Sequence, residues 1–279
     1  MLRYLSLLLF VAACGYCAWY GVEHYDELIA YVSPSQRAEK PILTFEASCT
    51  PEELMKSHEK ELVKDANHAL SKANVQFLPF LLMDVKYVRP DKKTEEAKLI
   101  WSMENGEMVL DTQSFETTHG FEDCIKAKAL DDDFRILHEV QRHNGQMTKE
   151  ALCQALGMDP DIVFERLEAL RRKHLVAIRG DMVRIHLDSP LLHVQPQTKV
   201  YHYFVTKIVP GTSEIVPHYS KDQIRRIAQA CFGPDFAIRQ EHILYVPIFQ
   251  INVQNPDGST QKTYWNAVTC KRIELKRLL

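Results

Sequence analysis

The chain has 279 residues, with 34 Lys and Arg against 37 Asp and Glu, which gives a formal net charge of −3 at pH 7. At roughly 100–200 residues per domain, this length accommodates about two domains. A hydrophobic content of 46% and a charged content of 25% are ordinary for a globular protein and exclude a disordered or fibrous chain. The near-neutral charge provides no general attraction to nucleic acid. Only 10 glycines are present, which leaves little scope for a glycine-rich phosphate loop.

Residues 1–22 predict a membrane anchor or a signal segment. Tyr4 to Val22 is a run of 19 uncharged residues, preceded by Arg3 and followed by an acidic cluster. A helix of this length spans about 28 Å, close to the thickness of the hydrocarbon core of a bilayer. Because positive charge favours the cytoplasmic side, the pattern predicts a cytoplasmic N-terminus and a C-terminal body in the periplasm or cell envelope.

A second interpretation of the same segment is a lipoprotein signal. The residues VAACG, with the cysteine at Cys14, resemble a bacterial lipobox, in which such a cysteine is lipidated after cleavage. Lipoproteins usually continue into a polar tether, whereas this chain stays apolar as far as Val22. An uncleaved anchor is therefore the preferred prediction, and lipidation at Cys14 or simple cleavage are the alternatives.

Two parts of the chain resemble each other, which indicates an internal duplication. Residues 75–85 (VQFLPFLLMDV) align with residues 243–253 (ILYVPIFQINV) at an offset of 168. Trp101 aligns with Trp265 at an offset of 164, and Thr50 with Ser220 at an offset of 170. Thr50 and Ser220 can each cap a helix, so each copy predicts a strand, a helix, a long strand and a hairpin whose second strand carries the tryptophan. We expect two α+β modules, over residues 42–125 and 200–279, with both tryptophans in the core.

The two copies differ in charge. Residues 23–130 contain 13 basic and 20 acidic side chains, whereas residues 199–279 contain 11 basic and 6 acidic ones. Opposite net charges favour packing of the copies on each other, either within one chain or between chains of a homo-oligomer.

Residues 131–187 resemble a winged-helix domain. Apolar residues at helical spacing predict one helix around 134–140, a second between Thr148 and Gly157, and a third that starts at Asp159-Pro160. Residues 174–178 and 182–186 then predict a hairpin, which corresponds to the wing. Residues 188–199 contain two prolines and predict the linker to the second copy.

The winged-helix resemblance implies DNA binding, but the charges argue against it. In DNA-binding members the first half of the third helix enters the major groove. Here that half carries Asp159, Asp161 and Glu165, which phosphates would repel. Only Arg166, Arg179 and Arg184 could reach a DNA backbone, fewer than phosphate contacts usually require. We therefore expect this domain to be a platform for another protein or a structural spacer.

The sequence offers no convincing catalytic or metal site, so no catalytic residue, metal or cofactor is predicted. His138 and His143 are five residues apart, not four as in a zincin HExxH motif, so they lie about 140° apart on a helix and are expected to face solvent. His119 and Cys124 lack a third group that would orient them for catalysis.

The cysteines are ambiguous about the compartment. Beyond the anchor there are Cys49, Cys124, Cys153, Cys231 and Cys270, and none occupies a duplicated position. A repeated disulfide framework is therefore excluded, and an odd number fits a fully oxidised exterior poorly. Cys153 is predicted to be a buried thiol on the second helix of the winged-helix domain.

Together these patterns predict an α+β fold, with an N-terminal membrane anchor or signal segment and two related α+β modules flanking a winged-helix domain. The strand and hairpin parts of the modules faintly resemble PepSY-type envelope modules, which implies an extracytoplasmic binding role. The expected function is that of a non-enzymatic interaction or scaffold protein of the bacterial envelope, bound to the membrane through residues 4–22 and to another protein. The alternatives are a membrane-tethered DNA-binding regulator and an enzyme of unrecognised type.

Overall fold

The computed structural model describes residues 39–63, 69–70, 73–255 and 257–275, and these form a mixed α+β structure, as expected. The predicted anchor at 1–22, with Cys14, lies outside the described residues. Within those residues, no helix has the length and apolar character needed to cross a membrane. The elements, in chain order, are β1 (Lys40–Phe45), α3 (Pro51–Ser57), α4 (Glu59–Leu62), β2 (Ala69–Leu70), β3 (Asn74–Val88), β4 (Thr94–Ser102), β5 (Met108–Val109), α5 (Phe121–Lys126), α6 (Asp131–Arg142), β6 (Gln146–Thr148), α7 (Lys149–Leu156), α8 (Pro160–Arg172), β7 (Val176–Arg179), β8 (Met182–Ile185), β9 (Phe204–Val209), η2 (Gly211–Ser213), α9 (Lys221–Phe232), β10 (Phe236–Gln254), β11 (Thr260–Asn266) and β12 (Lys271–Ile273).

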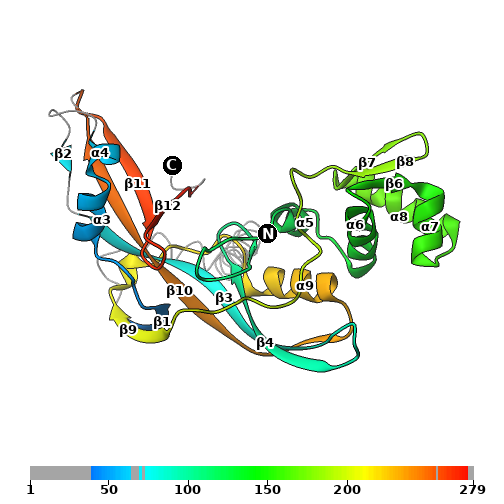
Figure 1. Ribbon diagram of the computed structural model, residues 1–279, viewed down its shortest axis with the longest axis horizontal. Coiled ribbons are helices and arrows are strands. Elements are labelled where there is room, and N and C mark those ends of the chain that lie inside the picture. The colour runs from blue at the N-terminus through cyan, green and yellow to red at the C-terminus, as the bar shows by residue number, and fades with distance from the viewer. Residues whose placement is uncertain (1–38, 64–68, 71–72, 256, 276–279) are drawn as a thin grey trace, which may run out of the picture.

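The main sheet contains strands from both copies of the duplication. Its central order is β12-β11-β10-β3-β4-β5, and the long strands β3 and β10 pair in antiparallel fashion at its centre (Figure 1). Leu78 lies opposite Val246 in this pairing, and these two residues occupy equivalent positions of the two copies. Phe77 lies opposite Pro247 and Pro79 lies opposite Tyr245, so the pairing is reciprocal. The two copies are thus related by a local two-fold axis that passes between Leu78 and Val246.

The two-fold relation extends beyond the central strands. Trp101 pairs with Leu81 on one side, and Trp265 pairs with Phe249 at the equivalent place on the other. The outer strands β5 and β12 pair with β4 and β11 in matching register, although the sequence alignment did not include them. The copies do not form separate modules, because their strands share one continuous sheet.

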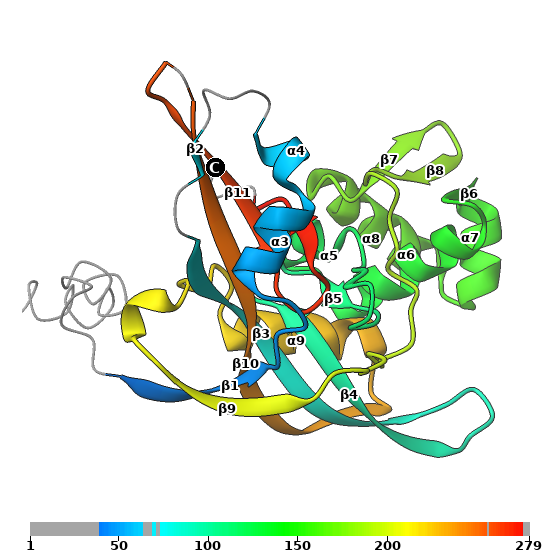
Figure 2. The same cartoon turned by 60° about the vertical axis from the view of Figure 1, so that its left-hand side comes forward.

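The helices of the two copies are exchanged across this sheet. Leu54 of α3, in the first copy, packs in a buried cluster with Phe249, Ile251 and Trp265 of the second copy. The second copy's α9 shares a buried cluster with Leu81, Met83 and Val85 of the first copy. Figure 2 shows α3 and α4 at the end of the sheet formed by β10 and β11, with α9 near β3. Each copy therefore supplies the helix that covers the other copy's strands.

The two faces of the sheet have different coverings. Neighbouring residues of a strand point to opposite faces, so the odd-numbered positions of β3 and β10 pack against α9 and α3 respectively. Even-numbered positions, including Leu78, Phe80, Val246 and Ile248, form a separate apolar cluster on the other face. That second face is the one on which the candidate site lies.

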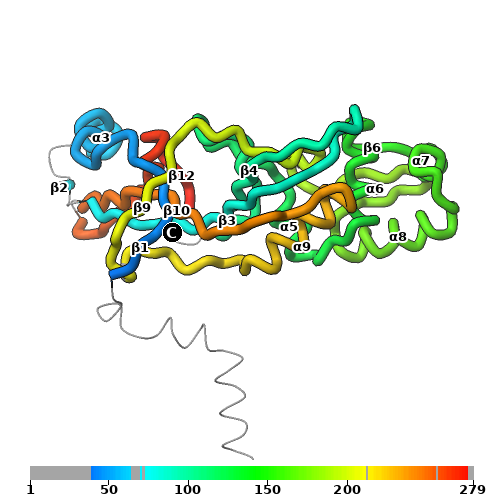
Figure 3. The backbone as a smooth tube through the Cα atoms, turned by 90° about the horizontal axis from the view of Figure 1, so that it is seen from below, coloured from blue at the N-terminus to red at the C-terminus, as the bar shows by residue number. Residues whose placement is uncertain are grey.

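Residues 131–187 form three helices and a small sheet with the order β6-β8-β7. The helices α6, α7 and α8 and the hairpin β7–β8 occupy the segments at which the sequence predicts them. Figure 3 shows this unit at one end of an elongated molecule. Its apolar residues belong to the same buried cluster as α9 and part of β3, and α6 contacts α9 and α5, so the unit is joined to the main sheet through these two helices.

The segment 188–199 connects this unit to the second copy, but it is not a loose linker. Leu192 is completely buried. The Thr198 backbone N–H donates to the Lys98 carbonyl at 2.7 Å, and its hydroxyl donates to the Val109 carbonyl at 2.6 Å. The segment therefore runs along β4 and β5 as a fixed part of the fold.

Candidate binding cavity

A cavity of about 510 Å³ lies on the second face of the main sheet, above the local two-fold axis. Its floor repeats across the axis, because Leu78 and Val246 are equivalent, as are Phe80 and Ile248. Ser102 and Asn266 form a third equivalent pair at the wall. Residues at aligned positions of the two segments thus form the floor of the cavity.

The rim of the cavity is acidic. It is formed by the loop between β4 and β5, the residues around α5, the segment that leaves β8, and the residues after β12. Among the described residues that line the cavity there is no lysine or arginine. The carboxylates are Glu104, Glu107, Glu122, Asp123, Asp188 and Glu274.

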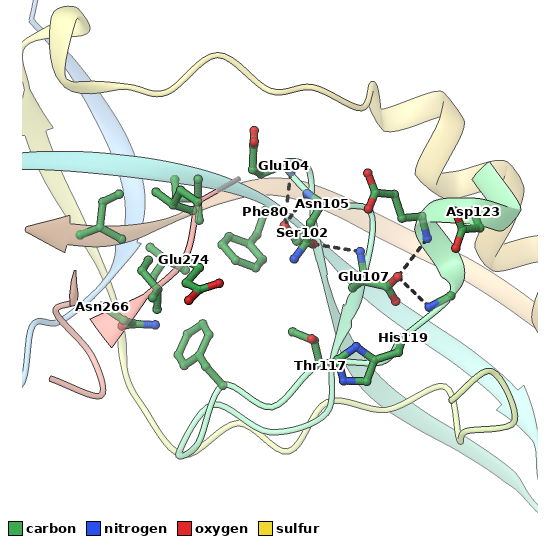
Figure 4. A pocket seen from close by; sticks show the side chains of 18 of the residues that line it. Phe80, Ser102, Glu104, Asn105, Glu107, Thr117, His119, Asp123, Asn266 and Glu274 are labelled. Atoms are coloured by element: carbon green, nitrogen blue, oxygen red, sulfur yellow. Dashed lines mark hydrogen bonds between the residues drawn. The ribbon is translucent and has the colours of Figure 1, made fainter. Parts of the chain in front are cut away.

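Glu107 is the buried member of this group and holds the start of α5 in place. Its Oε1 accepts hydrogen bonds from the backbone N–H of Gly120 at 2.9 Å and of Glu122 at 3.0 Å. Its Oε2 accepts one from the Thr118 hydroxyl at 2.8 Å. Burial outweighs these bonds and raises the pKa of Glu107 from 4.5 to about 7. Its charge is therefore reduced near neutral pH, and its role is to position the rim (Figure 4).

Glu122 is also compensated by neighbouring groups. Its Oε1 lies 2.8 Å from Lys126 Nζ and accepts a hydrogen bond from the Tyr219 hydroxyl at 3.2 Å. The exposed carboxylates of the rim are Asp123, Asp188 and Glu274. Of these, Glu274 extends from the C-terminal side of the cavity toward the space beside Phe80 (Figure 4).

A second cluster of polar residues lies where α6 meets α9. His138 Nε2 lies 3.6 Å from the Sγ of Cys231, and the rings of His138 and His193 are 5.4 Å apart. Burial lowers the pKa of His138 to about 4 and raises the pKa of the Cys231 thiol. At neutral pH the pair is an uncharged imidazole beside a protonated thiol, which is not an activated nucleophile.

This cluster corrects one expectation for α6. The sequence predicts that His138 and His143 face solvent. His143 is exposed, but His138 is partly buried at the interface between α6 and α9. His119 is exposed at the cavity rim, while Cys124 is buried in the core and burial raises its thiol pKa. Among the described residues there is no group of three or more side chains that could hold a metal ion.

The arginines considered for DNA binding lie in two places. Arg166, on α8, forms an ion pair with Asp132 of α6, with 3.1 Å between Nη2 and Oδ2. Arg179 and Arg184 lie on the outer face of the β7–β8 hairpin, because both are exposed and the opposite face carries buried Val183 and Ile185. Arg166 is therefore held in an ion pair, whereas Arg179 and Arg184 are exposed on the hairpin.

The sequence did not reveal a disulfide between Cys49 and Cys270, which lie 221 residues apart. It ties the segment before α3 to the loop between β11 and β12, next to the buried Trp265. The remaining described cysteines, Cys124, Cys153 and Cys231, are buried free thiols, and Cys153 is buried as predicted. The exchange of the helices places the two cysteines together, and no spacing in the sequence signals it.

The cavity was also missed by sequence reasoning. Its acids are scattered over residues 104–274, and only the fold brings them together. The available signal was the alignment of residues 75–85 with 243–253, since it contains the floor positions. Comparisons with protein-family models, curated proteins and solved structures found no match to this chain.

Proposed function

We propose that this chain is a non-enzymatic interaction or scaffold protein of the bacterial envelope, anchored by residues 4–22, with its body outside the cytoplasm. The observation that carries the proposal is the disulfide between Cys49 and Cys270. Structural disulfides form and persist in oxidising compartments and are rare in the cytosol. With these two cysteines paired and three thiols buried, the odd number of cysteines no longer argues against an exterior location.

A winged helix at residues 131–187 would serve this protein as a surface for another protein. Two large apolar side chains of α8 are partly exposed, Ile162 at 49% and Phe164 at 42%, and they lie on different sides of the helix. These side chains could contact another protein, and the acids Asp161 and Glu165 on the same helix oppose binding to phosphates. These features favour a protein partner over DNA.

A binding role also suits the chemistry of the buried thiols and the cavity. The pKa of both Cys124 and Cys231 is raised by burial, so neither thiol is poised to act as a nucleophile. The cavity combines an apolar floor with a few polar groups, the usual composition of a ligand site.

The membrane topology tests this proposal. We would fuse alkaline phosphatase, which is active outside the cytoplasm, or a fluorescent protein, which matures inside, to residue 279 of the full chain. Phosphatase activity without fluorescence is expected. Fluorescence without phosphatase activity would overturn the proposal and favour the membrane-tethered DNA-binding regulator.

The state of the N-terminal segment is tested with the same fusions. Metabolic labelling with a lipid precursor, compared between the wild type and a Cys14→Ser variant, distinguishes lipidation from an uncleaved anchor. We expect no label that depends on Cys14, and a Cys14-dependent label would replace the anchor by a lipid attachment.

A further inference from the structure

We propose that the cavity on the local two-fold axis binds a basic side chain of a partner protein, an arginine or lysine that is flanked by apolar residues. The inference rests on the proposed function for one point only, that the partner is a protein. The remaining argument comes from the cavity itself, from its size, its floor and its rim.

The size and floor of the cavity suit the apolar part of such a segment. A volume of about 510 Å³ lies within the range of roughly 300–1,000 Å³ found for ligand sites. The floor and walls contain Leu78, Phe80, Phe115, Val246 and Ile248. These side chains can contact the aliphatic stem of a lysine or arginine, which packs on apolar surface while its charged end stays in a polar environment.

The rim supplies the charge that would recognise the cationic end. Asp123, Asp188 and Glu274 are exposed at the rim, and Glu104 is half-buried there. The described residues that line the cavity include no lysine or arginine. Asp123 and Asp188 also line a neighbouring pocket that contains Lys126 and Lys173, so Glu274 is the rim carboxylate that contributes most to the attraction of a cation. A guanidinium or ammonium group would form charge-assisted hydrogen bonds with these carboxylates, and the guanidinium can do so in a bidentate manner.

The acidic rim is not a by-product of the duplication. The floor repeats across the two-fold axis, but the carboxylates do not: Val268 and Lys271 are the sequence equivalents of Glu104 and Glu107, and Leu110 is that of Glu274. Asp188 comes from the region between the two copies, and Asp123 lies in the first copy beyond the segments that align with the second. A symmetric apolar floor has thus acquired an asymmetric charged rim, which fixes a single orientation for a ligand that has one charged and one apolar part.

The test is a titration of the purified full-length chain with three capped tripeptides, Leu-Arg-Leu, Leu-Gln-Leu and Leu-Glu-Leu, followed by calorimetry. We expect the arginine peptide to bind at least about tenfold more tightly than the glutamine peptide, and the glutamate peptide more weakly still. The arginine preference should shrink as the salt concentration rises, because exposed charges are screened.

Two variants locate this preference in the cavity. Glu274→Gln removes a rim charge from an exposed position, so the fold is retained, and it should reduce the arginine preference at least about threefold. Glu96→Gln is the matched control, because it removes the same charge from an exposed position of β4, outside both the cavity and residues 131–187, and should leave the preference unchanged.

The outcomes separate this inference from the proposed function. Equal binding of the arginine and glutamine peptides, or an equal effect of the two variants, would overturn the inference even if the C-terminus is outside. Agmatine, a free aliphatic guanidinium, serves as a further probe. If it binds as tightly as the arginine peptide, the partner is a small molecule and the inference is wrong. A cytoplasmic C-terminus together with a retained arginine preference would overturn the proposed function alone.

Discussion

The two halves of the main sheet pair in the same register but are covered by different structures. The half made of β3, β4 and β5 lies under α9 and α5 and shares one large buried cluster with the three-helix unit. The half made of β10, β11 and β12 lies under α3 and α4, in a much smaller cluster that a disulfide closes. The strand pairing is thus the repeated feature, and the covering is the variable one.

This difference follows from what each half requires. Each half must bury the same strand positions, such as Leu81 and Phe249, but any apolar surface of adequate size can do this. A small cluster removes less apolar surface from water and stabilises its region less. The disulfide beside Trp265 adds stability there by restricting the unfolded chain.

The largest effects are expected from the two equivalent tryptophans. Trp101→Ala and Trp265→Ala should each lower the free energy of unfolding by about 3–5 kcal/mol, because both side chains are fully buried. Each indole N–H donates a hydrogen bond, from Trp101 to the Gly106 carbonyl at 2.6 Å and from Trp265 to the Thr263 hydroxyl at 3.1 Å. Trp101 should cost more, since it lies in the large buried cluster and Trp265 in the small one. Denaturant titration of both variants measures the comparison. An equal loss at the two positions would show that the difference in covering has no energetic consequence.

The disulfide provides the next comparison, because only one half has it. The double variant Cys49→Ala/Cys270→Ala should lose about 2–5 kcal/mol of unfolding free energy. A reductant should weaken the wild-type chain by a similar amount and leave the double variant unchanged. If the reductant destabilises both equally, the bond does not account for the loss.

His138 and Glu107 should make the free energy of unfolding depend on pH in opposite directions. The pKa of His138 is lowered to about 4, so the unfolded chain binds the extra proton between about pH 4 and 6.5, and stability falls as the pH drops through this range. The pKa of Glu107 is raised to about 7, so the folded chain binds the extra proton between about pH 4.5 and 7, and stability falls as the pH rises. Each shift corresponds to at most about 3.5 kcal/mol, and the two oppose each other.

Single variants should expose these opposing contributions. Glu107→Gln is expected to steepen the rise of unfolding free energy between pH 5 and 6.5 relative to the wild type, as the contribution of His138 is then no longer offset. His138→Asn should reverse the slope. An unchanged pH profile in both variants would contradict the assignment of these two groups.

The sequence was sufficient for features with local or repeated signals. The positions of α6, α7, α8 and the β7–β8 hairpin follow from helical periodicity and turn residues, and the alignment of Thr50 with Ser220 located both helix caps. The burial of Trp101 and Trp265 followed from the same alignment.

What the sequence could not predict depends on the exchange of the helices and on pairing between the copies. The contact of His138 with Cys231 and the bond between Cys49 and Cys270 each join segments that are far apart in the chain. Strand pairing across the two-fold axis also determines the cavity, because Leu78 and Val246 meet only there. Spacing along the chain carries no information about any of these contacts.

The helix caps should give the smallest difference and the finest comparison of the two halves. Thr50 and Ser220 each form a capping box, with Glu53 and Gln223 respectively. Thr50→Ala and Ser220→Ala should each cost about 1 kcal/mol.

We expect Ser220→Ala to lower the global unfolding free energy, because α9 buries Ile224, Ile227, Ala228 and Cys231 in the large cluster. In α3 only Leu54 is buried, and the neighbouring disulfide holds the chain at Cys49, so Thr50→Ala should chiefly speed amide exchange within α3. Hydrogen exchange read residue by residue measures this, with Thr50→Ser as the control that keeps the hydroxyl. A global loss from Thr50→Ala as large as that from Ser220→Ala would show that α3 unfolds only with the whole sheet, and the two halves would then be a single cooperative unit despite their different coverings.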